Sequence, residues 1–267
     1  MGWAQPGSAG PRTAVCASGK TGSGEGLRAT AQLALFGGFE LRLGGEKVGL
    51  PVHAQRVLAY LALRKMAGEE CGRQVLAERL WENSSPERSS ASLRTALWRI
   101  RRAGPELLAG DGDRVTLADY VEVDVDRFRR RAEAMLSGTG GTQAHVRTLC
   151  TAAELLPGWD EDWLLLCREQ VRLLRLHTLE AVARRYCEQG RYPQAIDLIL
   201  RVVAEEPLRE SAQAILIEAH LGEGNAAEAR RQFDRFAATL WRELELRPSA
   251  ELGHRVGLPV CAATTRS

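Results

Sequence analysis

The sequence predicts an α+β N-terminal half followed by an all-α C-terminal half. Between residues 31 and 122, short apolar runs interrupted by paired glycines alternate with stretches of helical periodicity. From Val123 onward the apolar residues recur at helical spacing only. The chain has 267 residues, of which 45% are hydrophobic and 26% charged. This is the balance of a globular protein with room for two domains.

Residues 1–30 are rich in glycine, serine and alanine and hold almost no large apolar side chains, which predicts a disordered tail. Within it, residues 14–21 fit a relaxed phosphate-loop pattern, with Ala14 in place of the first glycine. A working loop needs a strand before it and a helix after it, so that backbone N–H groups converge on the phosphates. Neither is predicted here, so a nucleotide hydrolase is the most remote of three functional hypotheses.

Structure is expected to begin at Ala31. Residues 32–51 indicate short strands broken at Gly37-Gly38 and Gly44-Gly45. Between these glycine pairs, apolar and charged residues alternate as in a half-buried antiparallel sheet, in the order Phe39, Glu40, Leu41, Arg42, Leu43.

Three helices and a hairpin follow in the sequence. The first helix is expected over 54–66, and the second over 72–81 with Val75, Leu76, Ala77 and Leu80 facing inward. A polar loop over 82–88 leads to a third helix, capped by Ser89 or Ser90 and ended by Gly104-Pro105. Asp111-Gly112 lies between two short apolar segments and predicts a β-hairpin with a two-residue turn. This order predicts a winged helix-turn-helix with an additional N-terminal sheet.

The third helix concentrates positive charge, although the net charge of the chain is only +2. Leu93, Leu97 and Ile100 form its apolar stripe. From Arg88 to Arg102 there are five arginines and no acid, and arginine pairs with phosphates and with guanine edges. We therefore predict DNA contacts from this helix, from the start of the second helix and from the hairpin tip. The predicted DNA-binding residues are Arg73, Arg94, Thr95, Trp98, Arg99, Arg101, Arg102 and Arg114. Trp98 has two equally weighted roles, stacking on DNA or packing against the sheet or hairpin.

The C-terminal half is expected to contain six helices, over 124–136, 142–156, 162–189, 193–205, 209–222 and 226–244. Residues 137–142 indicate a flexible connection, and residues 253–267 a frayed tail. Gly190 aligns with Gly224 and Ala195 with Ala229, an offset of 34 residues that is typical of tetratricopeptide repeats. A tetratricopeptide-like domain is therefore favoured over a generic bundle, and such arrays bind partners or self-associate.

No pattern in the sequence indicates catalysis, a cofactor or a metal site. The six cysteines and five histidines do not fall into ligand spacing, and no nucleophile is placed by a motif. No apolar run is long enough to span a membrane, so a cytoplasmic protein with free thiols is expected.

Four segments of the N-terminal half share motifs with one known family, namely Leu35–Leu41, Gln55–Leu63, Leu80-Trp81 and Ser92–Arg102. Through these segments, the sequence resembles the Streptomyces antibiotic regulatory proteins. The segments that resemble the bacterial transcriptional activation domain of this family are Leu155–Trp163, Glu206–Ala212, Ala219–Asn225 and Leu246–Ser249. The resemblance runs in order from about Ala31 to Leu252.

The resemblance implies an OmpR-type winged helix over 31–122 and an activation domain over 123–252, the short form of the family. It implies a nucleoid-associated activator that binds direct repeats in double-stranded promoter DNA beside a second protomer. RNA polymerase would be recruited through its sigma and alpha or beta subunits, at gene clusters for antibiotics and other secondary metabolites. The loop implied to touch polymerase comprises Glu82, Asn83, Ser84, Ser85, Glu87 and Arg88. The alternative hypothesis is an interaction scaffold whose winged helix binds protein rather than DNA.

Overall fold

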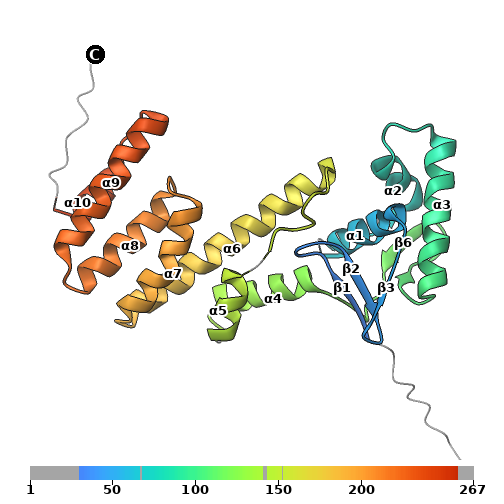
Figure 1. Cartoon of the computed structure of the whole chain (residues 1–267), viewed down its shortest axis with the longest axis horizontal. Coiled ribbons are helices and arrows are strands. Elements are labelled where there is room, and N and C mark those ends of the chain that lie inside the picture. The colour runs from blue at the N-terminus through green and yellow to red at the C-terminus, as the bar shows by residue number, and fades with distance from the viewer. Residues whose placement is uncertain (1–29, 67, 141–142, 152, 258–267) are drawn as a thin grey trace, which may run out of the picture.

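The computed structural model describes residues 30–66, 68–140, 143–151 and 153–257. The molecule is elongated, with the N-terminal sheets and helices at one end and the last helices of the chain at the other (Figure 1). Two helices, α4 (Asp124–Leu136) and α6 (Asp162–Glu188), run along the middle and join the two ends. The predicted tail and the phosphate-loop-like segment 14–21 lie outside the described residues.

A four-stranded sheet with the order β3-β2-β1-β7 begins the fold. It consists of β1 (Ala31–Ala34), β2 (Glu40–Leu43), β3 (Glu46–Val48) and β7 (Val121–Val123). The glycine-delimited strands are confirmed, because β1, β2 and β3 pair antiparallel as a meander. The parallel strand β7, which pairs Ala31 with Val121, was not predicted. The three residues of β7 are too few to show the alternation of apolar and polar side chains that marks a strand.

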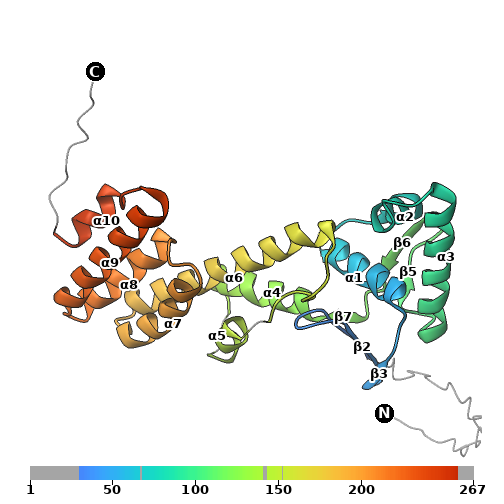
Figure 2. The same cartoon turned by 45° about the horizontal axis from the view of Figure 1, so that its top comes forward.

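Three helices and a second sheet complete the N-terminal part. The helices are α1 (Val52–Met66), α2 (Arg73–Leu80) and α3 (Pro86–Ala103). The second sheet has the order β4-β6-β5 and contains β4 (Cys71–Gly72), β5 (Leu108–Ala109) and β6 (Arg114–Leu117). Figure 2 shows α3 at the outer end of the molecule, with α2 and the β5–β6 hairpin beside it.

Several local predictions for this part were wrong. Val75 is 58% exposed rather than inward, although Leu76, Ala77 and Leu80 are buried as expected. Gly72 belongs to β4, which was not predicted, because two residues carry no pattern. The β5–β6 turn is closed by a hydrogen bond from Arg114 N to Asp111 O at 3.1 Å. Its central residues are therefore Gly112 and Asp113 rather than Asp111 and Gly112, and Gly112 supplies the positive φ of 58°.

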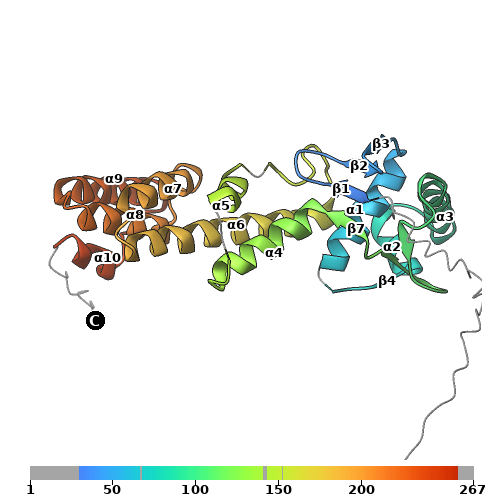
Figure 3. The same ribbon diagram turned by 90° about the horizontal axis from the view of Figure 1, so that it is seen from below.

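The C-terminal helices agree with the prediction except at two places. After α4 come α5 (Gln143–Cys150), α6, α7 (Tyr192–Glu205), α8 (Glu210–Gly222), α9 (Ala226–Leu244) and α10 (Ala250–Arg255). The helix expected over 142–156 is too long, because α5 ends at Cys150 and Leu155 makes a strand-like bridge to Phe36. The chain also remains helical to Arg255, three residues into the predicted frayed tail. Figure 3 shows α7, α8, α9 and α10 gathered at one end of α6.

The predicted repeat is visible in the backbone geometry of two turns. Gly190 and Gly224 have φ angles of 69° and 85°, a conformation that favours glycine. The residues that follow them, Arg191 and Asn225, both have φ −90° and ψ 56°. Ala195 and Ala229, one turn later, are both fully buried, so a small side chain lets the next helix approach closely at each position.

A segment from the C-terminal half completes the N-terminal core. Leu155, Leu156, Trp163 and Leu164 belong to the same buried apolar cluster as α1, α2 and α3. Leu156 N donates to Leu35 O at 2.8 Å, and Gly37 N donates to Glu154 O at 2.8 Å. The two halves of the chain therefore share a core rather than meeting only through a linker.

Two side chains fix this junction. Arg168 of α6 donates hydrogen bonds to the carbonyl oxygens of Leu155, Leu156 and Trp159 at 2.9, 2.5 and 3.0 Å. Asp124, the first residue of α4, accepts the N–H groups of Leu35 and Phe36 at 3.0 Å. Burial raises the pKa of the Asp124 carboxyl, although these backbone N–H groups oppose the rise.

A buried ion pair connects α6 with the start of α8. Glu180, whose side chain is 4% exposed, accepts from Arg209 Nε at 2.6 Å and from Ser211 Oγ at 2.7 Å. Burial alone raises the pKa of the Glu180 carboxyl. The hydrogen bonds from Arg209 and Ser211 outweigh that effect and hold the pKa below its usual value.

Glu180→Gln is expected to lower the free energy of unfolding by about 2 kcal/mol at neutral pH, because a charge-assisted hydrogen bond is lost. A lowered folded pKa stabilises the fold above the unfolded pKa of about 4.3, and this stabilisation is lost as pH falls through the folded pKa. Urea unfolding at pH 7 and near pH 4 should therefore show a smaller difference between the two proteins in acid. A difference that does not change with pH would contradict the assignment.

Candidate nucleic-acid interface

Helix α3 separates an apolar face from a basic one. Leu93, Leu97 and Ile100 are at most 3% exposed and pack into the N-terminal core, as predicted. The opposite surface consists of exposed residues that the sequence analysis had assigned to DNA contact. They are Arg94, Thr95, Trp98, Arg99, Arg101 and Arg102. The structure therefore places six of the eight predicted residues on one exposed helix surface.

The ends of α3 follow from local sequence. The N-cap is Ser85, whose hydroxyl accepts the N–H of Arg88 at 3.4 Å, and Pro86 occupies the first helical turn. The prediction of Ser89 or Ser90 as the cap was wrong, because Ser89 is already buried inside the helix. Glu87 and Arg88 consequently lie in the first turn rather than in a loop. Gly104 is the C-cap, as predicted.

The arginines of α3 have no acidic partner among the described residues. Arg88, Arg94 and Arg101 make no side-chain hydrogen bond or ion pair within the parts of the chain that the structure describes. In contrast, all four arginines of α9 are paired with a carboxylate. These are Arg230, Arg231, Arg235 and Arg242. Uncompensated charge is therefore concentrated at α3, where it remains available for a polyanion.

Trp98 lies on the basic surface of α3. Its side chain is 51% exposed. The guanidinium carbons of Arg99 and Arg102 lie 5.0 and 5.4 Å from the ring centroid, within cation–π distance. The ring therefore holds two of the arginines close to the helix surface.

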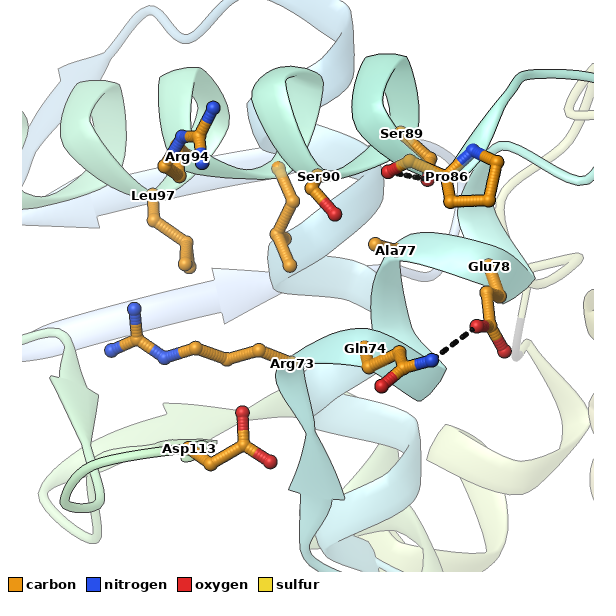
Figure 4. Close-up of a pocket in the computed structure, with 11 residues that line it drawn as sticks. Arg73, Gln74, Ala77, Glu78, Pro86, Ser89, Ser90, Arg94, Leu97 and Asp113 are labelled. Carbon is orange, nitrogen blue, oxygen red and sulfur yellow. Dashed lines mark hydrogen bonds between the residues drawn. The ribbon is translucent and has the colours of Figure 1, made fainter.

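Residues of α3, α2 and the β5–β6 turn line a pocket of about 330 Å³. Arg73 extends from the first turn of α2 beneath Leu97, on the side of Asp113 (Figure 4). Its Nε atom is buried and has no hydrogen-bond partner among the described residues. Because a buried donor without a partner is costly, this guanidinium is suited to an external acceptor. Arg94 lines the same pocket, so the structure brings these two predicted residues together.

Arg114 is placed differently from the other seven residues. It is the first residue of β6, and its side chain is exposed. Its guanidinium forms an ion pair with Glu70 at 2.5 Å, which offsets part of its charge. Both partners are exposed, and such surface pairs contribute about 0–1 kcal/mol and exchange easily.

The loop implied to touch polymerase is exposed over 82–88. Glu82 forms an ion pair with Arg79 at 3.1 Å, and Ser84 N donates to Trp81 O. Asn83 and Ser84 line a pocket of about 370 Å³ together with residues 160–162 at the start of α6. The loop therefore lies next to the C-terminal half of the chain, a proximity that spacing in the sequence did not reveal.

Sequence reasoning missed two residues of this surface. Ser90 lines the pocket with Arg73 and Arg94, but it had been considered only as a cap. Ala91 is exposed one turn before Thr95, on the same helix face. The helical period of 3.6 residues aligns Ala91 with Thr95 and Trp98, so this second position was available from spacing alone.

Neither a metal site nor a membrane span is found in the described parts of the chain. No group of three or more His, Cys, Asp or Glu side chains is arranged to hold a metal ion there. No helix among these residues is both long and apolar enough to cross a bilayer. The described cysteines, Cys71, Cys150, Cys167 and Cys187, are free thiols.

Comparison with known proteins places this chain among regulators of transcription. The bacterial transcriptional activator domain matches residues 123–255. The transcriptional regulatory protein MoaR1 of Mycobacterium tuberculosis is 29% identical over 238 residues, which cover 82% of this chain and 75% of MoaR1. The regulatory protein AfsR of Streptomyces coelicolor is 26% identical over 196 residues, which cover 69% of this chain but only 20% of AfsR.

A solved structure shows the same fold. Mycobacterium tuberculosis EmbR, determined in complex with a low affinity phosphopeptide, superposes with a TM-score of 0.65 over 87% of this chain and 66% of the EmbR chain. The sequences are 21% identical in that comparison, so the likeness concerns the fold alone.

The matched domain and the two sequence relatives define the class of this protein, which is a transcription regulator rather than an enzyme. Within that class, the chain carries the bacterial transcriptional activator domain and is similar to MoaR1 and AfsR, which supports the resemblance to the Streptomyces antibiotic regulatory proteins that the sequence motifs indicated.

Proposed function

We propose that the protein is a sequence-specific, DNA-binding transcriptional activator whose recognition helix is α3. The observation that carries this proposal is the row of exposed arginines on α3 without acidic partners. Guanidinium groups bind phosphate oxygens and the O6 and N7 atoms of guanine, and an α-helix fits the major groove. The scaffold alternative gives no reason for leaving this charge uncompensated.

The surrounding elements support a winged helix-turn-helix of the OmpR type. α2 precedes α3 through a short turn, and the β5–β6 hairpin follows in the position of a wing. Arg73 and Arg94 in their shared pocket are suited to one backbone phosphate, and Arg114 on the hairpin to the flanking strand. In this proposal, residues 31–122 are the DNA-binding domain and residues 123–252 the activation domain.

Activation is proposed to proceed through contact with RNA polymerase. The exposed segment formed by Glu82, Asn83, Ser84 and Ser85, with Glu87 and Arg88 in the first turn of α3, is available beside the DNA-facing surface. The family further supports binding of direct repeats by two protomers and control of a secondary-metabolite gene cluster. The repeated turns at Gly190 and Gly224 support a tetratricopeptide-like helical domain for a partner or a second protomer.

The test is selection of genomic DNA fragments by the full chain at increasing salt, followed by sequencing and by footprinting of the recovered sites. We expect enrichment of spaced direct repeats upstream of genes, with protection of two half-sites. Protection of a single half-site by one protomer would remove the direct-repeat proposal. Absence of binding even at low salt would contradict the DNA-binding function and favour the interaction scaffold.

A further inference from the structure

The basic surface of α3 contains an apolar ridge. Ala91, Thr95 and Trp98 are all exposed and follow one another at i, i+4 and i+7, so they lie along one line on the helix. This line faces away from the buried stripe of Leu93 and Leu97. The ridge is therefore the part of α3 that projects furthest from the protein.

Thr95 presents its methyl group on this ridge. Its hydroxyl donates a hydrogen bond to Ala91 O at 3.0 Å, the carbonyl one turn earlier in the same helix. Because Cγ2 and Oγ1 leave the same carbon in different directions, a hydroxyl directed back to the helix leaves the methyl group outward. Thr95 therefore adds an apolar group, between the methyl of Ala91 and the ring of Trp98.

Arginines flank the ridge on both sides, and Arg102, one turn after Trp98, continues its line toward the end of the helix. Helical geometry places Arg94 and Arg101 along one side and Arg88 and Arg99 along the other. Phosphates lie on both walls of the major groove, so two flanks of cations suit a helix inserted between them. The line between the flanks then faces the base edges, where cations contact guanine and apolar groups contact the C5-methyl of thymine.

We infer that α3 reads thymine methyl groups through the ridge of Ala91, Thr95 and Trp98, while the flanking arginines bind backbone phosphates and guanine. This inference rests on the proposed DNA-binding function and names the bases that the centre of the site takes. Phosphate binding alone does not account for an exposed apolar line within a basic surface. Burial of methyl groups against this line in the groove accounts for it.

The test uses the full chain and a duplex recovered by selection from a random-sequence library. The duplex is resynthesised with one thymine at a time replaced by deoxyuridine, which removes only the C5-methyl. Dissociation constants are then measured by fluorescence anisotropy for the wild type and three variants. Thr95→Ser removes the methyl and keeps the hydroxyl, Thr95→Val keeps a methyl and removes the hydroxyl, and Trp98→Ala removes the ring.

We expect uracil at one or more central positions to weaken wild-type binding about fourfold, the value for one buried methyl group. Thr95→Ser is expected to lose this sensitivity at one thymine, and Thr95→Val to keep it. Trp98→Ala is expected to lose the sensitivity at a neighbouring thymine. Thermal melts of the variants, all at exposed positions, verify that each is folded.

Equal wild-type affinity for every uracil duplex would overturn the inference and leave the DNA-binding function intact. Retained uracil sensitivity in both Thr95→Ser and Trp98→Ala would also overturn it. Failure to enrich any duplex would contradict the DNA-binding function itself, and with it the inference.

Discussion

Replacing Arg99 and Arg101 together by alanine is expected to weaken binding of the selected DNA by about 100-fold or more. Each guanidinium is exposed on α3 and lacks an acidic partner among the described residues, so its removal breaks no ion pair, although Arg99 also loses its cation–π contact with Trp98. A charge-assisted hydrogen bond contributes about 1.5–3 kcal/mol, and 1.4 kcal/mol corresponds to a factor of ten. Fluorescence anisotropy with the labelled duplex measures the change.

A matched control removes the same charge elsewhere. Arg230→Ala with Arg242→Ala also deletes two exposed arginines, but these form ion pairs with Asp234 and Glu243 on α9. Affinity for DNA should change less than threefold in this control. A threefold change corresponds to about 0.6 kcal/mol of binding free energy, which is the size expected of a surface substitution. Equal losses in the two double variants would mean that net charge, rather than α3, determines binding.

Leu97→Ala is expected to lower the free energy of unfolding by about 2–5 kcal/mol, because truncation leaves a cavity in the core. Leu97 is 2% exposed and belongs to the cluster in which α1, α2 and α3 pack together. Urea unfolding followed by circular dichroism measures the loss. DNA affinity at a temperature where the variant remains folded should be nearly unchanged.

The same substitution on the surface provides the control. Leu166 is 65% exposed on α6, so Leu166→Ala should change the free energy of unfolding by less than about 0.5 kcal/mol. A Leu97→Ala protein as stable as the control would mean that the apolar stripe of α3 does not face the core.

The sequence predicted the helices, and the buried and exposed faces of α3, because their patterns are long. The stripe of Leu93, Leu97 and Ile100 spans two turns of α3, which is enough to define a buried face and hence the opposite exposed one. The glycine and alanine pairs that recur after 34 residues predicted two turns with the same backbone geometry. Such patterns involve residues close together in the sequence, so they can be recognised in a single sequence.

What was missed depends on contacts between distant segments. β7 exists because Val121–Val123 pairs with β1, about 90 residues earlier, and no local pattern marks it. α5 ends early because Leu155 and Leu156 are held by Leu35 and Phe36, just after β1, and by Arg168. Val75 is exposed because one turn of a short helix cannot distinguish neighbouring apolar residues, so tertiary packing decides which of them is buried.

The central claim is that α3 binds DNA through its uncompensated arginines, and salt dependence of binding tests it most directly. The logarithm of the binding constant for the selected duplex is measured against the logarithm of salt concentration. If five arginines of α3 each neutralise one phosphate, counterion release predicts a slope of about −4.5. In Arg99→Ala with Arg101→Ala, the slope should become shallower by about two units. A shallow slope for the wild type, or the same slope in both proteins, would contradict the account.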